Sequence, residues 1–220
     1  MLSAVEIVAL HDNRTSRWHE MPVDSAEGTL ALPGTIADAS ERPAETDWLG
    51  LVNRQHRANF ELWHIEDEAR APGATDAELA GVKRRVDWTN QRRNDLVEEL
   101  DRALLAWLEA RGLPNPAAAL HSESPGLIVD RLSILALKIY HTREEAERAD
   151  APAGHAQRNF ERLAILEEQR ADLAACLEAL WRETLAGTRR FKLYRQLKMY
   201  NDPSLNPAIY RAAPPARFLG

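Results

Sequence analysis

The segment of residues 125–148 constrains the fold more than any other part of the sequence. Placed on a helical wheel, its apolar side chains point in nearly every direction. These side chains are Leu127, Ile128, Val129, Leu132, Ile134, Leu135, Ala136, Leu137, Ile139 and Tyr140. A helix that is apolar all round is buried by other elements on all sides. The segment therefore predicts a central helix that several other helices enclose.

Helical periodicity appears in three more segments, at residues 46–70, 76–111 and 155–186. Breaks rich in glycine and proline separate the four segments from one another. Signals for helix N-termini precede three of the four segments. These signals are Thr46 or Asp47, a capping box of Thr75 and Glu78, and Ser124 followed by Pro125. Residues 5–10 fit either a short strand or a helix. We predict an all-α, single-domain bundle of four main helices with an irregular N-terminal region.

The predicted domain has an N-terminal arm and loop at 1–45, a helical core at 46–186 and a basic segment at 187–220. The basic segment carries a local charge of +6 in a chain whose total is −6. It either folds back onto the acidic body or binds an anion, and we expect it to be ordered. Its cations alternate with aromatic side chains, which also suits nucleic acid, but the acidic body argues against nucleic acid as a partner.

The composition excludes several classes of protein. No apolar run approaches the ~20 residues that span a bilayer, and the first ten residues lack the basic start of a secretory signal. The single cysteine, Cys176, excludes an intrachain disulfide and a zinc site made of cysteines. We therefore expect a cytoplasmic protein without a membrane span.

Residues 49–70 depart from the usual two-sided pattern of a surface helix. One side is apolar, and we expect the polar side, with Arg54, Arg57, Glu61, His64 and Glu68, to face solvent. A third stripe mixes aromatic and ionisable side chains: Val52, His56, Asn59, Phe60, Trp63, Glu66, Asp67 and Arg70. Buried charges need partners. The expected partners gather within about a third of the wheel of the central helix: Asp130, Arg131, Lys138 and His141.

Two interpretations of this polar contact stay open. In the first, salt bridges such as Asp67–Arg131 or Glu66–Lys138 only fix the register of the two helices. In the second, a pocket between the helices binds an anionic small molecule. The candidate catalytic residues of this pocket are His56, Glu66, Asp67 and Asp130. The candidate ligand-binding residues are Trp63, Arg70, Arg131, Lys138, Tyr194 and Lys198.

Each residue type has a chemical role in the pocket hypothesis. Arginine and lysine side chains hold the anion, since the guanidinium fork fits a phosphate and the ammonium acts as a point charge. The carboxylates act as general base or metal ligand, and His56 carries a proton. Trp63 provides a stacking wall, and the basic segment closes over the ligand.

Metal motifs are weak. Glu61 and His64 have the spacing of di-iron bundles, but a second Glu-x-x-His is missing and both fall on the expected solvent side. Residues 98–101 resemble half of the magnesium-binding motif of helical nucleotide pyrophosphatases, without its companion. We predict no protein metal site, although a magnesium ion held by one or two carboxylates and a substrate phosphate is compatible with the sequence.

Three stretches carry a resemblance to a known family: NFELWHIEDEAR at 59–70, SESPGLIVDRLSIL at 122–135 and YRQLKMYNDP at 194–203. They resemble the uncharacterised bacterial family called domain of unknown function 4254, across about residues 45–210. Members are encoded near glycosyltransferases of the cell envelope, so the resemblance implies a role in surface-glycan synthesis. It implies no particular reaction.

The sequence thus leads to one main hypothesis and one rival. The main hypothesis is a helical bundle whose internal pocket binds a phosphorylated sugar or nucleotide-sugar. The rival is a non-catalytic partner of a glycosyltransferase, in which the charged cluster is structural. Whether the protein is an enzyme stays open, and a homo-oligomer is compatible with either hypothesis.

Overall fold

The computed structural model describes residues 2–21, 47–195, 197, 204–207 and 211. Its helices are α1 (Ala4–Glu20), α2 (Trp48–Glu68), α3 (Asp76–Glu109), α4 (Pro125–Glu147) and α5 (His155–Leu185). Two short strands, β1 (Ala119–Leu120) and β2 (Arg189–Arg190), pair in parallel. The predictions for residues 22–46, for Lys198 and for the basic segment at 196, 198–203, 208–210 and 212–220 lie outside the described residues. The all-α prediction is confirmed.

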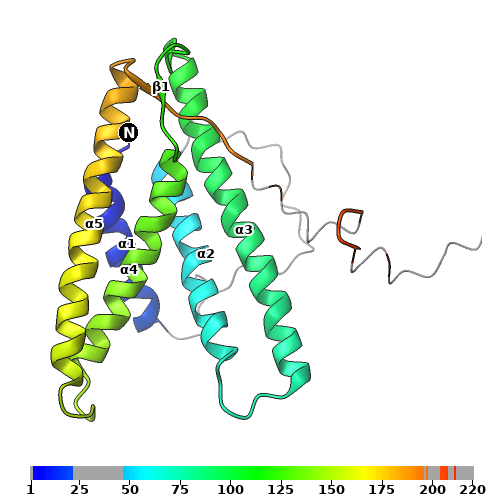
Figure 1. The fold of residues 1–220 in the computed structure, drawn as a ribbon, viewed down its shortest axis with the longest axis vertical. Helices are drawn as coiled ribbons and strands as arrows, with labels where there is room; N and C mark the ends of the chain where they lie inside the picture. Colours follow the sequence, from blue (N-terminus) through cyan, green and yellow to red (C-terminus); the bar gives the residue numbers. More distant parts are fainter. Residues whose placement is uncertain (1, 22–46, 196, 198–203, 208–210, 212–220) are drawn as a thin grey trace, which may run out of the picture.

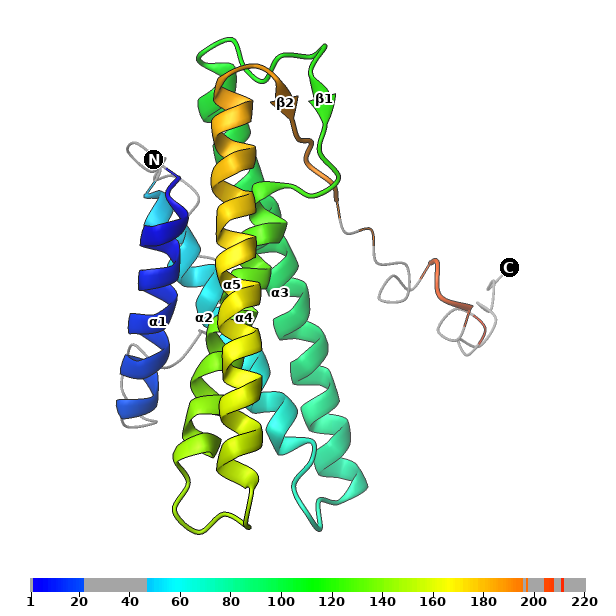
Figure 2. The ribbon, with the colours of Figure 1, turned by 60° about the vertical axis from the view of Figure 1, so that its left-hand side comes forward.

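Helix α4 occupies the centre of the bundle, as its apolar wheel predicts. It contacts α1, α2, α3 and α5. Helices α2 and α3 form one antiparallel pair, α4 and α5 form a second, and α1 lies along the flank of the bundle (Figures 1 and 2). The core is apolar and includes Val52, Leu100, Ile128, Leu132 and Leu177, all fully or almost fully buried. None of the described helices is long and apolar enough to cross a membrane.

The predicted N-terminal caps of three helices are present. Asp47 accepts a hydrogen bond from the Gly50 N–H at 2.9 Å. Thr75 forms both hydrogen bonds of the capping box at the start of α3, and Ser124 caps α4 in front of a proline. The start of α4 is also fastened to α3, because the Asp101 carboxylate accepts the Gly126 N–H at 2.7 Å.

For residues 4–20 the prediction of an irregular N-terminal region is wrong, because they form helix α1. Its buried side chains recur every three or four residues. They are Ala4, Ile7, His11, Thr15 and Trp18. The helical period shows only over the whole segment, because the first ten residues alone fit a strand as well as a helix.

Helix α1 covers part of the side of α2 that was expected to face solvent. The Arg57 guanidinium lies 4.9 Å from the ring centroid of Trp18, and the His64 ring lies 5.1 Å from the His19 ring. Arg57, Glu61 and His64 are therefore partly buried, and for them the solvent prediction is wrong. Arg54 and Glu68 are exposed, as predicted.

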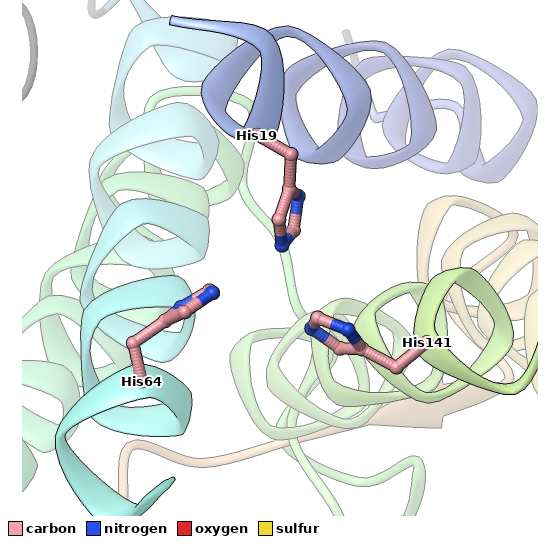
Figure 3. A group of neighbouring side chains, drawn as sticks. All are labelled: His19, His64 and His141. Atoms are coloured by element: carbon pink, nitrogen blue, oxygen red, sulfur yellow. The ribbon is translucent and has the colours of Figure 1, made fainter. Parts of the chain in front are cut away.

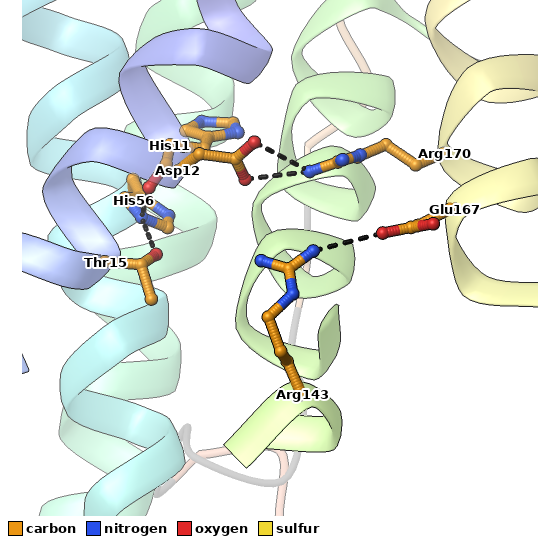
Figure 4. A network of polar contacts seen from close by, with 7 residues as sticks. All are labelled: His11, Asp12, Thr15, His56, Arg143, Glu167 and Arg170. Carbon is orange, nitrogen blue, oxygen red and sulfur yellow. Dashed lines mark hydrogen bonds and ion pairs between the residues drawn. The ribbon is translucent and has the colours of Figure 1, made fainter. Parts of the chain in front are cut away.

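Polar contacts fix α1 to its neighbours (Figure 4). Arg170 of α5 donates to both carboxylate oxygens of Asp12, at 2.8 and 2.9 Å. Nε2 of His56 lies 3.0 Å from the Thr15 hydroxyl and 3.1 Å from the His11 carbonyl oxygen. Helix α1 is therefore an integral part of the bundle.

Candidate functional site

A cleft of about 350 Å³ lies between α2, α3 and α4, where the mixed stripe of α2 faces the other two helices. We call it the α2–α4 cleft. Its lining consists of Asn59, Leu62, Trp63, Glu66, Asp67, Arg70, Arg93, Ile134 and Leu137. Six of these residues come from α2 and its C-terminal end, and their spacing of three to four places them on one helical face.

The lining combines an apolar part with four charged side chains. Leu62, Ile134 and Leu137 provide aliphatic surface, and Trp63 adds an aromatic ring. Trp63 is also stacked on His141, with ring centroids 4.9 Å apart and an angle of 10° between the planes. This stacking fixes the indole in the wall of the cleft.

Two of the charged lining residues already form an ion pair. Arg70 Nη1 lies 3.1 Å from Glu66 Oε2, and the arginine side chain is 69% exposed. An exposed pair of this kind contributes at most about 1 kcal/mol to stability, so a ligand can recruit Arg70 at small cost. Asp67 is exposed beside it.

Asp130 of α4 holds two further lining side chains in place. Its carboxylate accepts a hydrogen bond from Asn59 at 2.9 Å and lies 3.7 Å from Arg93 Nη1. Gln55 donates to the same carboxylate at 2.6 Å. Burial raises the pKa of Asp130, while the Arg93 cation and the two amides oppose that shift. Asp130 therefore orients Asn59 and Arg93 from behind the wall.

The structure brings together part of the predicted site. Trp63, Glu66, Asp67 and Arg70 share the α2–α4 cleft, and Asp130 lies next to it.

Arg131 and Lys138 lie elsewhere, on a second cleft of about 770 Å³ that also contains residues of α5. Arg131 pairs with Glu123 at 2.9 Å there, so neither Asp67–Arg131 nor Glu66–Lys138 is formed. The reason is geometric: consecutive helical residues differ by about 100°, so Asp130 and Arg131 face different neighbours of the central helix.

His56 and Tyr194 also lie outside the α2–α4 cleft. His56 is fully buried, and burial lowers its pKa to about 3, so the imidazole is neutral at pH 7. Its Nδ1 accepts from the Ser133 hydroxyl at 2.7 Å, which ties α2 to α4. Tyr194 is 45% exposed in the segment that follows β2.

No pattern in the sequence marks Arg93 as a lining residue. It lies on the charge-rich part of α3, and only the packing of α3 against α2 shows that its guanidinium reaches the cleft. Asn59, in contrast, belongs to the mixed stripe of α2 and could be found from the wheel.

Comparison with known proteins gives one match. The family model described as "Protein of unknown function (DUF4254)" matches residues 49–193, which contain α2 to α5 and both strands. No curated protein and no solved structure matches the chain.

Proposed function

The chain belongs to the family of proteins of unknown function DUF4254, and from this premise we propose that its α2–α4 cleft binds an anionic small molecule. The ligand class we propose is a phosphorylated sugar or a nucleotide-sugar, used in the cytoplasm of a bacterium for the synthesis of cell-envelope glycans. The observation that carries the proposal is that one cleft combines two arginines, two carboxylates and an indole ring.

Each of these groups fits one part of such a ligand. Arg70 and Arg93 suit a phosphate, because a guanidinium donates two parallel hydrogen bonds to it. Glu66 and Asp67 can accept hydrogen bonds from sugar hydroxyls. Trp63 offers a flat apolar surface for a sugar ring or a nucleobase. The volume of about 350 Å³ lies near the lower limit of ordinary ligand pockets, which favours a sugar phosphate.

Glu66 and Asp67 are also the groups that we propose for chemistry on such a ligand. Both carboxylates are at least partly accessible to solvent. A magnesium ion commonly binds through one or two protein carboxylates together with substrate phosphate oxygens. In this role the two residues would share the ion with the phosphate held by Arg70 and Arg93.

Thermal-shift screening of the full chain tests the proposal, because a ligand that binds only the folded state raises its melting temperature. The panel contains sugar phosphates, nucleotides and nucleotide-sugars, each with and without Mg²⁺. Titration calorimetry then gives the affinity of the best ligand. We expect Arg93→Met and Arg70→Met each to weaken binding about 10- to 100-fold, the effect of losing one charged hydrogen-bonding group.

Arg131→Met is the matched control, since it removes the same guanidinium from the second cleft. It should leave the affinity unchanged. If Arg131→Met abolishes binding and Arg93→Met does not, the ligand belongs to the second cleft and the proposal is wrong. The rival hypothesis of a structural charged cluster predicts no ligand and a clear loss of stability in Asp67→Asn, whereas our proposal predicts an unchanged melting temperature for this exposed side chain.

A further inference from the structure

Three histidines from three different helices converge at the flank of the bundle. They are His19 of α1, His64 of α2 and His141 of α4, and one ring nitrogen of each lies within 4.8 Å of the corresponding nitrogen of the others. Figure 3 shows the three rings pointing toward a common centre. We call this group the three-histidine cluster.

Two of the rings are oriented by the same local contact. His19 Nδ1 lies 2.7 Å from the Thr15 carbonyl oxygen, and His64 Nδ1 lies 2.8 Å from the Phe60 carbonyl oxygen. A carbonyl oxygen can only accept a hydrogen bond, so Nδ1 carries the proton in both rings. The lone pair of each neutral ring is therefore on Nε2.

The third ring is oriented by a carboxylate. His141 Nδ1 lies 2.8 Å from Glu144 Oε2, one turn further along α4, and donates its proton there. His141 Nε2 then carries the lone pair, as in the other two rings. Histidines that bind a metal almost always donate their second ring N–H to a carbonyl oxygen or a carboxylate in this manner.

Two of these nitrogens lack any partner within the described structure. His19 Nε2 and His141 Nε2 are both buried and accept no hydrogen bond. A buried polar atom without a partner costs roughly 1–3 kcal/mol, so native structures seldom leave one without a ligand or a purpose. A bound cation would satisfy both atoms at once.

Aromatic contacts hold the rings in place. His19 is stacked on Tyr140, with centroids 4.2 Å apart, and His141 is stacked on Trp63. Such packing preorganises ligand side chains before the metal arrives.

We propose that His19, His64 and His141 bind a divalent transition-metal ion of the Zn²⁺ class through their Nε2 atoms. Imidazole nitrogen suits zinc and its neighbours in the first transition series, whereas Mg²⁺ and Ca²⁺ select oxygen ligands. Three histidines also match a common zinc set in which a water or substrate occupies the fourth tetrahedral position.

The geometry requires only a small contraction. Zinc–nitrogen bonds of 2.0–2.1 Å place tetrahedral ligand atoms about 3.3 Å apart, so the nitrogens must approach one another by at most about 1.5 Å from their present separation. Small rotations of the histidine side chains that keep the rings stacked must supply this movement. None of the three histidines lines the α2–α4 cleft, and the two sites touch only through the stacking of His141 on Trp63.

Titration of the full, metal-free chain with Zn²⁺ tests the proposal, with calorimetry as the first readout and the visible absorption of bound Co²⁺ as the second. We expect one ion per chain and the strong absorption of tetrahedral cobalt. The substitutions His19→Ala, His64→Ala and His141→Ala should each weaken Zn²⁺ binding more than about 100-fold. Glu144→Gln, which changes a positioning residue, should weaken it by about 10- to 100-fold.

His121→Gln and His155→Gln are the matched controls, because both histidines lie outside the cluster. Each should bind Zn²⁺ within twofold of the original chain. Glu144 is 53% exposed, so its variant reports on the site even if a histidine variant fails to fold. The proposal is overturned if the original chain binds no stoichiometric Zn²⁺, or if the folded cluster variants and Glu144→Gln bind it as tightly as the controls.

Discussion

Replacing His56 by glutamine should make the stability of the protein less sensitive to acid. In the folded protein the His56 ring is fully buried between α1, α2 and α4. Its Nε2 lies 3.1 Å from the His11 carbonyl oxygen, which can only accept, so Nε2 carries the proton and Nδ1 accepts from the Ser133 hydroxyl. A second proton has no place in this arrangement, and burial accordingly lowers the pKa to about 3.

The size of the effect follows from linkage between protonation and folding. The usual pKa of 6.5 applies in the unfolded chain, so between pH 6.5 and 3 the unfolded state binds more protons than the folded state. Stability is therefore lost as the pH falls through this range. For His56 alone the loss between pH 7 and pH 4.5 is about 2.5 kcal/mol, out of a total stability of about 5–15 kcal/mol for a domain.

Two other buried groups titrate in the same range and make the variant comparison necessary. Burial lowers the pKa of His11, which adds to the loss in acid, and burial raises the pKa of Asp101 to about 6, which opposes it. The Asp101 effect is shared by the original chain and by His56→Gln. The His11 effect comes mainly from burial, which both proteins share, with a smaller contribution from the neighbouring His56 ring. The difference between the two proteins therefore measures His56 together with its effect on His11.

Urea unfolding at pH 7 and at pH 4.5 measures this difference. At pH 7 His56→Gln should be less stable by about 1–3 kcal/mol, since a buried hydrogen-bonding group is exchanged for a poorer fit. At pH 4.5 the difference in the free energy of unfolding between the two proteins should be smaller by about 2.5 kcal/mol. His121→Gln serves as control, because this histidine lies in the loop before α4. An equal gap for His56→Gln at both pH values would refute the reasoning.

Two further predictions concern the junction of α3 and α4. Gly126→Ala should destabilise the protein by about 1–2 kcal/mol in urea, because a Cβ there would lie 2.7 Å from the Val97 carbonyl oxygen, and this clash outweighs the gain in helix propensity. Gly81→Ala, in open space on α3, should instead stabilise it by up to about 1 kcal/mol, and a similar effect of both substitutions would contradict the packing argument. In the original chain, ionisation of Asp101 lowers the free energy of unfolding as the pH rises, because burial raises the pKa of this carboxyl. The free energy of unfolding of Asp101→Asn should therefore increase by up to about 3 kcal/mol relative to that of the original chain as the pH rises from 4 to 8. Parallel pH profiles of the two proteins would show that Asp101 does not titrate in this way.

The helices of the core could be predicted from the sequence because their signals are local. The segments 46–70, 76–111, 125–148 and 155–186 agree with α2 to α5 within two residues at each end. Caps such as Thr75 act on the next few backbone amides and need no tertiary contact. The central position of α4 follows from its own composition, since an apolar wheel has to be covered.

Contacts between helices were harder to predict, because a wheel gives the direction of a side chain and not its neighbour. Asp130 and Arg131 fall within one sector of α4, yet the first contacts side chains at the α2–α4 cleft and the second lines the opposite cleft beside α5. Ile134 lines both clefts, so a single side chain of α4 separates them at this point. A sector of about 120° is wide enough to reach two neighbouring helices.

The three-histidine cluster illustrates what a sequence pattern can add once the missing helix is known. His19, His64 and His141 each directly follow an aromatic residue, Trp18, Trp63 or Tyr140. In a helix the aromatic ring takes the buried direction, and the next side chain lies about 100° away, at the margin of the packed surface. Three helices that bury such pairs against one another bring the three histidines to a shared margin. The pattern is visible in the sequence. Without α1, however, only His64 and His141 can be placed on predicted helices, His64 on the expected solvent side, and two imidazoles alone do not complete a zinc site.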